Sequence, residues 1–164
     1  MNESIEIATM LLRRDDVEGL RLAPYRCPAG YWTIGIGNRF LADGSPVTAS
    51  TPPLTEGEAL NLLRHTLDNL RAKLDDAISV PLTPCQAGAL LSWQFNIGST
   101  AMYRSTLRTL LNQGQYCAAG EQLLRWDKAS VQGRMVVLPG LKKRRQLERA
   151  VYFGLPLTGT AHSK

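Results

Sequence analysis

The sequence is poor in the residues that build metal centres and disulfide frameworks. Only three cysteines and two histidines occur among its 164 residues. The cysteines are odd in number and show no Cys-x-x-Cys spacing, and His65 and His162 fall into no recognisable metal-ligand pattern. We therefore expect free thiols, no metal and no other cofactor.

A long hydrophobic segment is also missing. The apolar stretches are only a few residues long, whereas a helix that spans a bilayer needs roughly 20 apolar residues. Acidic residues precede the short apolar patch of segment 1–16, whereas a signal peptide begins with basic residues. We expect no membrane anchor and no signal peptide, and hence synthesis in the cytoplasm. A target outside the cytoplasm then requires separate delivery or a breach of the membrane.

The composition is that of an ordinary globular protein with a positive charge. Hydrophobic residues make up 44% and charged residues 20% of a chain of single-domain size. The formal net charge of +5 favours an anionic partner, and nucleic acids, membrane surfaces and bacterial walls all meet this description. Charge alone does not choose among them.

Hydrophobic spacing and turn residues predict an α+β fold with two lobes that share a cleft. Apolar residues at helical spacing indicate a short helix over residues 3–13. Within 14–54, glycines punctuate aromatic and β-branched residues, which predicts a small β-rich lobe of short strands and tight turns. Residues 80–154 read as almost entirely helical and form the second lobe with the first helix. The tail 155–164 is expected to be frayed.

The strongest helix prediction covers residues 55–79. Thr55 and Glu58 form a capping-box pattern, and apolar residues, mostly leucines, then recur every three or four residues. About 24 residues at 1.5 Å each give a rod of roughly 36 Å, which is long enough to connect two lobes. Further helices are predicted over 105–112, 115–126 and 139–152.

Glu18 lies near the start of the predicted β-rich lobe and beside Gly19. Such a glutamate can face a cleft, although most glutamates are solvated surface charges. The surrounding segment 18–38, EGLRLAPYRCPAGYWTIGIGN, closely resembles the active-site signature of phage-type lysozymes, glycoside hydrolase family 24. Glu, Gly-x-Arg-Leu, Tyr, Gly and Thr-Ile-Gly-x-Gly occur in order without a gap. The likeness continues through VPLTPCQAGALLSWQFNIG, STLRTLLNQGQYCAAGEQLLRW and VLPGLKKRRQLERA.

The resemblance implies one lysozyme-like domain over residues 1–164, with an active-site cleft between its lobes. The implied reaction is hydrolysis of the β-1,4 bond between N-acetylmuramic acid and N-acetylglucosamine in peptidoglycan, with inversion of configuration. Glu18 is then the general acid that protonates the leaving oxygen, because an alkoxide departs poorly as the bond stretches toward an oxocarbenium-like state. This role requires Glu18 to hold its proton near neutral pH, which partial burial would favour.

The second catalytic role, to orient or deprotonate a water molecule, is implied for Cys27 and Thr33. T-even members have an aspartate at the position of Cys27, so this sequence departs from their pattern. A thiol is mostly un-ionised at neutral pH and is a weaker electrostatic partner than a carboxylate. The alternative for Cys27 is a small apolar side chain packed in a turn. Asp43 in the next loop is either a replacement carboxylate or a solvated turn residue.

Substrate contacts are implied for Asn96 and Thr106. The amide of Asn96 can both donate to and accept from an N-acetyl group, but the position also suits a polar residue near a helix end before Gly98. Thr106, with Ser105 nearby, resembles the cleft-facing hydroxyls of the family. An N-cap role explains Ser105 equally well.

An arginine pairs with the catalytic glutamate in T-even members, and simple alignment places Leu141 at its position. Arg144 and Arg145, one turn away, are alternative supporting residues, and the choice between them stays open. The run Lys-Lys-Arg-Arg at 142–145 could indicate nucleic-acid binding, but it is more typical of a solvated helix face. Asn38 stands where many family members have a histidine, and we expect a local change in packing there.

The leading hypothesis is a muramidase that lyses bacteria for a phage or prophage. It would act as a monomer on peptidoglycan after release through the inner membrane. Its rival is a lysozyme-fold protein that binds glycan strands but has lost efficient catalysis because Cys27 replaces the carboxylate. A nucleic-acid-binding protein is supported only by net charge and the basic run, without a recognition-helix or RNA-binding signature. We therefore expect no nucleic-acid partner.

Overall fold

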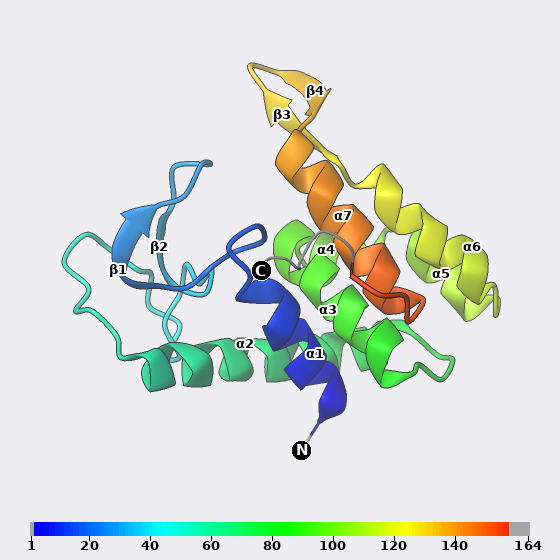
Figure 1. Cartoon of the computed structure of the whole chain (residues 1–164), viewed down its shortest axis with the longest axis horizontal. Coiled ribbons are helices and arrows are strands. Elements are labelled where there is room, and N and C mark those ends of the chain that lie inside the picture. The colour runs from blue at the N-terminus through cyan, green and yellow to red at the C-terminus, as the bar shows by residue number, and fades with distance from the viewer. Residues whose placement is uncertain (1, 158–164) are drawn as a thin grey trace.

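The chain begins with a helix, continues through a small antiparallel hairpin and then forms a set of packed helices (Figure 1). The structure is a computed structural model that describes residues 2–157. The elements in chain order are α1 (Glu3–Leu12), β1 (Arg21–Arg26), β2 (Trp32–Gly35), α2 (Glu56–Ala77), α3 (Pro84–Ile97), α4 (Ser99–Tyr103), α5 (Thr106–Asn112), α6 (Tyr116–Gln122), the 3-10 helix η1 (Leu123–Arg125), β3 (Lys128–Val131), β4 (Arg134–Val137) and α7 (Pro139–Tyr152). The predicted α+β fold is confirmed. His162 and the tail beyond residue 157 lie outside the described residues.

The β1–β2 hairpin and the loops that follow it form the first lobe, which we call the β lobe. Tyr25 pairs with Thr33 and Arg21 pairs with Gly35, so the register shifts between the two ends of the hairpin. The lobe has its own small apolar core, which consists of buried Ile34, Val47 and Leu62. The β lobe therefore has a small core that it shares with α2, while Ile36, just after β2, belongs to the larger core of the helices.

Helix α2 links the β lobe to the helical lobe. Thr55 Oγ1 accepts from the Glu58 N–H at 3.1 Å, and the Glu58 carboxylate accepts from the Thr55 N–H at 2.8 Å, so the predicted capping box is present. Near the start of the helix, Leu62 packs in the β-lobe core, whereas Leu67 and Leu74 belong to the larger core. One rod thus contributes to both lobes, as Figure 1 shows.

Helix α3 is the central element of the helical lobe. Every residue from 87 to 94 is buried, and α1 and α7 both pack against the helix (Figure 1). A helix that is buried on all sides needs neighbours on all sides. Trp93 meets Trp126 edge to face, with ring centroids 5.7 Å apart. Helix α3 ends at Ile97, and its last residues face the cavity between the lobes that is described below.

A second hairpin, β3 and β4, interrupts the segment that was predicted to be almost entirely helical. Val131 pairs with Arg134 across a two-residue turn, in which Gln132 and Gly133 have φ values of 51° and 81°. Two positive φ values are typical of a type I′ hairpin turn, for which Asn-Gly and Asp-Gly are the usual signals. The prediction was wrong here because Gln-Gly is a weak signal and the strands are short and largely exposed.

We predict that Gly88→Ala destabilises the fold. An added Cβ at Gly88 would lie 2.5 Å from Ile7 Cγ2 and 3.1 Å from the Ser4 carbonyl oxygen, because α1 crosses α3 closely there. The free energy of unfolding, measured by urea denaturation, should fall by about 1–3 kcal/mol.

Gly57→Ala is the matched control. Gly57 lies in the first turn of α2, and the nearest atom to an added Cβ there is Thr55 Oγ1 at 3.9 Å. Because alanine is the better helix former, this variant should be neutral or slightly more stable. Equal losses in both variants would contradict the close-packing explanation.

Candidate functional site

Glu18 is held in the turn that follows α1. The backbone N–H groups of Glu18 and Gly19 both donate to the Leu12 carbonyl, each at 3.1 Å. On its other side the Glu18 side chain packs against the turn after β2. A Cβ built on Gly37 would lie 2.5 Å from Glu18 Oε1, and Gly37 has a φ of 72°. Position 37 therefore requires glycine, both for the conformation and for the space that the carboxyl group needs.

A cavity of about 430 Å³, which we call the Glu18 cavity, lies between the two lobes. The β lobe contributes Cys27 and Thr33 to its wall, and the end of α3 contributes Asn96. Four residues that the sequence singles out, these three and Glu18, are thus brought together around one space. Arg39 and Phe95 also line the cavity, and the sequence did not single them out.

Arg144 is the cation that pairs with Glu18. Its Nη1 lies 2.5 Å from Glu18 Oε2, and its Nη2 donates to the Ser92 carbonyl at 2.8 Å. Burial lowers the pKa of Arg144, but the charges of Glu148 and Glu18 outweigh this effect and hold the pKa above its ordinary value. Arg144 is therefore a permanent charge that fixes the direction of the Glu18 carboxylate.

Arg145 supports Asn96 and does not contact Glu18. Its Nη2 donates to Asn96 Oδ1, and its Nε donates to the Trp126 carbonyl at 2.8 Å. Because the amide oxygen of Asn96 is engaged, the NH₂ group is the part that remains for a ligand. Arg144 thus pairs with Glu18 and Arg145 with Asn96, a difference that the sequence did not reveal.

One buried carboxylate, that of Glu148, holds both arginines. Its oxygens lie 3.1 Å from Arg144 Nε and 2.5 Å from Arg145 Nη1, and Ser92 Oγ donates to it at 2.6 Å. Glu148 was not among the residues predicted from the sequence, although its i+3 and i+4 spacing from two arginines on a predicted helix is a signal of side-chain pairing. The expectation of a solvated face at 142–145 is wrong for both arginines, because this network buries them.

Cys27 begins the turn that joins β1 to β2. Its N–H donates to the Tyr31 carbonyl at 2.9 Å, and its carbonyl accepts from the Gly30 N–H at 2.8 Å. Burial raises the pKa of the Cys27 thiol, but hydrogen bonds with three backbone groups of the turn and with Thr33 outweigh it and lower the pKa below its ordinary value. The Thr33 hydroxyl donates to the Tyr31 carbonyl at 2.9 Å and can rotate toward the sulfur. This turn therefore favours the thiolate.

Two other residues that the sequence singles out lie away from the Glu18 cavity. Thr106 begins α5, which Ser105 caps, and lines a separate cavity of about 330 Å³ with Trp126. Asp43 is exposed and accepts from the Ser45 N–H at 2.9 Å and from its hydroxyl at 2.6 Å, which lowers the pKa of Asp43. Asp43 is thus placed as a turn residue, and the contact of Thr106 with substrate stays a prediction.

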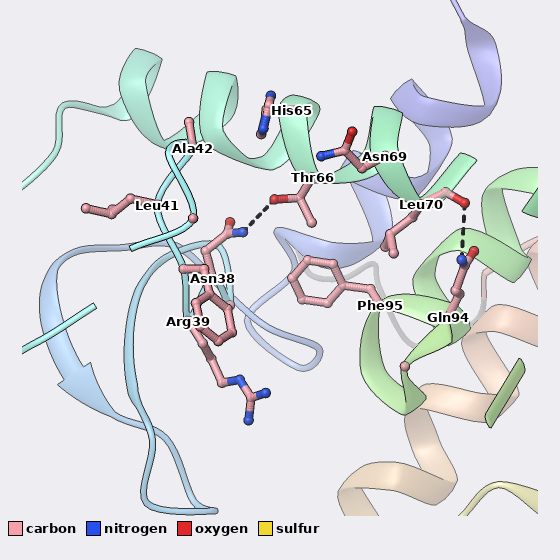
Figure 2. A pocket seen from close by; sticks show the side chains of 14 residues that line it. Asn38, Arg39, Leu41, Ala42, His65, Thr66, Asn69, Leu70, Gln94 and Phe95 are labelled. Atoms are coloured by element: carbon pink, nitrogen blue, oxygen red, sulfur yellow. Dashed lines mark hydrogen bonds between the residues drawn. The ribbon is translucent and has the colours of Figure 1, made fainter. Parts of the chain in front are cut away.

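A second cavity of about 370 Å³ adjoins the Glu18 cavity and is shown in Figure 2. Arg39 and Phe95 line both cavities, and the ring of Phe95 projects toward the space between α2 and the β lobe (Figure 2). Asn38 is buried at the wall, where its Nδ2 donates to Thr66 Oγ1 at 2.8 Å. The packing at Asn38 thus includes a hydrogen bond between the β lobe and α2.

The site can act through proton transfer, hydrogen bonding and fixed charge. Within residues 2–157, no group of three or more His, Cys, Asp and Glu side chains is placed to hold a metal ion.

None of the helices in that range has both the length and the apolar character needed to cross a membrane. The three cysteines are unpaired.

We predict that Glu148→Gln destabilises the protein strongly. The substitution leaves Glu18 as the sole carboxylate for two buried arginines, and an uncompensated buried charge costs about 3–5 kcal/mol. The measurement is the free energy of unfolding in urea.

Glu121→Gln is the control. It removes an exposed carboxylate of α6 that lies 2.5 Å from Arg149, which is on α7 like the two buried arginines. The loss should be below about 1 kcal/mol. If the two variants lose the same stability, the buried network does not make the contribution assigned to it.

Comparison with known proteins adds independent evidence. Residues 15–148 match the phage lysozyme family. The endolysin of Acyrthosiphon pisum secondary endosymbiont phage 1 is 41% identical over 147 residues, which cover 90% of this chain and 95% of that relative.

Solved structures show the same relationship. The endolysin from Escherichia coli O157:H7 phage FAHEc1 superposes with a TM-score of 0.82 at 32% identity, over 96% of each chain. The muramidase domain of SpmX from Asticaccaulis excentricus superposes with a TM-score of 0.71 at 30% identity, over 93% of this chain and 95% of that one. The chain belongs to the phage lysozyme family.

Proposed function

We propose that this peptidoglycan-hydrolysing lysozyme cuts the β-1,4 bond between N-acetylmuramic acid and N-acetylglucosamine, with inversion at the anomeric carbon. The observation that carries the proposal is the shared cavity, in which Glu18, anchored by Arg144, meets Cys27, Thr33 and Asn96. These groups supply an acid, a candidate base, a hydroxyl for water and an amide for the sugar.

Glu18 acts as the general acid. One carboxyl oxygen is bound to Arg144 at 2.5 Å, which leaves the other for the glycosidic oxygen. The Glu18 side chain has only 22% of its surface exposed, so a sugar in the cavity meets the carboxyl group in a largely enclosed position. Transfer of the carboxyl proton lets the leaving sugar depart as an alcohol while positive charge develops on the ring.

Cys27 and Thr33 act on the water that attacks from the opposite face of the sugar. The thiolate of Cys27 stabilises the developing positive charge and accepts a proton from the water, and the Thr33 hydroxyl orients that water by a hydrogen bond. The hydrogen bonds that lower the pKa of Cys27 support the ionised sulfur in this role. Attack from the face opposite the leaving group inverts the configuration.

Asn96 binds the acetamido group of a sugar through its NH₂ group. Arg145 holds the Asn96 oxygen, so the donor faces the ligand and the carbonyl of the N-acetyl group is the matching acceptor. Thr106 lines a cavity outside the Glu18 cavity, and its contact is therefore with a more distant part of the glycan.

The biological role is lysis of a bacterial host for a phage or prophage. We propose one domain, with the β-rich lobe at 14–54, the connecting helix at 55–79 and the helical lobe at 80–154, that works as a monomer. Its net charge of +5 aids adsorption to anionic wall polymers, and nucleic acid is not a partner. The protein is made in the host cytoplasm and reaches the wall after release through the inner membrane.

We predict that Glu18→Gln abolishes clearing of purified peptidoglycan. Loss of a positioned acid should lower the rate by at least about 100-fold, because the amide cannot deliver a proton. Turbidity and new reducing ends measure the rate. Analysis of the reducing sugar identifies the bond, and NMR of the first product gives its anomeric configuration.

Co-sedimentation with the wall separates the lysozyme from its rival. Glu18→Gln should still sediment with peptidoglycan, because the substitution leaves the cavity in place. Wild-type protein that sediments with the wall but releases no reducing ends would favour the glycan-binding alternative.

We predict that Cys27→Asp moves the acid limb of the pH–activity profile to lower pH. A required thiolate is present above the pKa of Cys27 and is lost as the pH falls through it, whereas a carboxyl group ionises with an ordinary pKa of about 3.9. The rate at neutral pH should change modestly. Cys117→Asp, at an exposed cysteine, is the control and should leave the profile unchanged. A large gain in the hydrolysis rate of Cys27→Asp at every pH would instead show that the natural site is nearly inactive.

A further inference from the structure

Arg39 lies where three cavities meet. It lines the Glu18 cavity, the cavity of Figure 2, and a third cavity of about 290 Å³ beside Tyr31 and Phe40 on the β lobe. Its backbone is fixed, because its carbonyl accepts from the Val47 N–H at 2.9 Å and the preceding Asn38 exchanges two backbone hydrogen bonds with Ile34. A single side chain, anchored through its backbone, therefore lines all three cavities.

The guanidinium of Arg39 is oriented but not neutralised. It stacks on Tyr31, 4.1 Å from the ring centroid, and lies 5.8 Å from that of Phe40. It points away from α2 in Figure 2. Within the part of the chain that the structure describes, Arg39 forms no ion pair, in contrast to Arg144 and Arg145. Stacking on an aromatic face leaves the edge of the guanidinium free, and that edge matches a carboxylate through two parallel N–H bonds.

We propose that Arg39 binds a carboxylate of the peptide that is attached to N-acetylmuramic acid. This inference rests on the proposed function, which places N-acetylmuramic acid at the scissile bond beside Glu18. The lactyl group of that sugar carries a short acidic peptide, so the peptide has to leave the Glu18 cavity along one of its walls. Arg39 is an exposed, unpaired and preorganised cation on such a wall.

The contact makes Arg39 a specificity residue that distinguishes peptide-bearing strands from bare glycan. Although Arg39 lines the same cavity, no hydrogen bond or ion pair links it to Glu18 or Arg144 in the described chain, so it does not help to hold the proton-transfer groups. Its removal should therefore weaken substrate binding and leave the chemical step in place.

The test compares Arg39→Gln with wild type on two substrates: purified peptidoglycan, and the same glycan strands after an amidase has removed the peptides. We expect KM for intact peptidoglycan to rise about tenfold with kcat nearly unchanged, and no change on stripped strands. The increase of the wild-type KM with sodium chloride should also become shallower in the variant.

Arg21→Gln is the matched control. Arg21 stacks on Tyr25 of the same lobe at 4.5 Å, and it lines none of these three cavities. The variant loses the same charge and the same kind of stacking contact, so it should keep the wild-type KM on both substrates. A rise in KM equal to that of Arg39→Gln would show that overall charge, not a site at Arg39, governs binding.

Arg39→Lys provides a second variant that keeps the charge but cannot form two parallel bonds. It should raise KM about threefold on intact peptidoglycan alone. Unchanged KM in both Arg39 variants, or equal losses on both substrates, would overturn the proposal. Wild-type protein that cleaves neither substrate would refute the proposed function instead, so the two failures are distinguishable.

Discussion

The fold and the site both depend on the neutralisation of two buried arginines on α7. Arg144 and Arg145 carry two positive charges into the interior, and Glu148 and Glu18 carry two negative charges to meet them. Buried charges are tolerated only when they are paired and hydrogen-bonded. Glu148 and both arginines lie on α7, and their hydrogen bonds with Ser92 and Asn96 of α3 fix how α7 packs against α3. The carboxylate of Glu18, which lines the cavity between the lobes, is therefore part of the charge balance that holds the helical lobe together.

The two sides of the cavity that carry Glu18 and Cys27 obtain their properties in different ways. On one side, a buried cation with fixed geometry directs a carboxyl group, which ties the acid to the helical lobe. On the other side, a turn of the β lobe surrounds the sulfur of Cys27 with hydrogen-bond donors and lowers its pKa. A T-even enzyme has a carboxylate on that side. Here local backbone geometry favours the charged form of a group that is ordinarily neutral.

Features that short-range chemistry determines were predictable from the sequence. The capping box of α2 and its apolar repeat act within a few residues, and the motif from Glu18 to Asn38 is contiguous. The choice between Arg144 and Arg145 depended instead on the approach of α7 to α3, which no local pattern specifies. The β3–β4 hairpin was missed because its strands are short and largely exposed, and because its Gln-Gly turn is a weak sequence signal. The position of Thr106 outside the Glu18 cavity likewise depends on how α5 packs.

The connection of the lobes through α2 has a mechanical consequence. Because the β lobe supplies Cys27 and Thr33 and the end of α3 supplies Asn96, a small rigid-body rotation of one lobe changes the width of the whole cavity at once. The width of the cavity is therefore set by how the two lobes pack on α2, which contributes side chains to both cores.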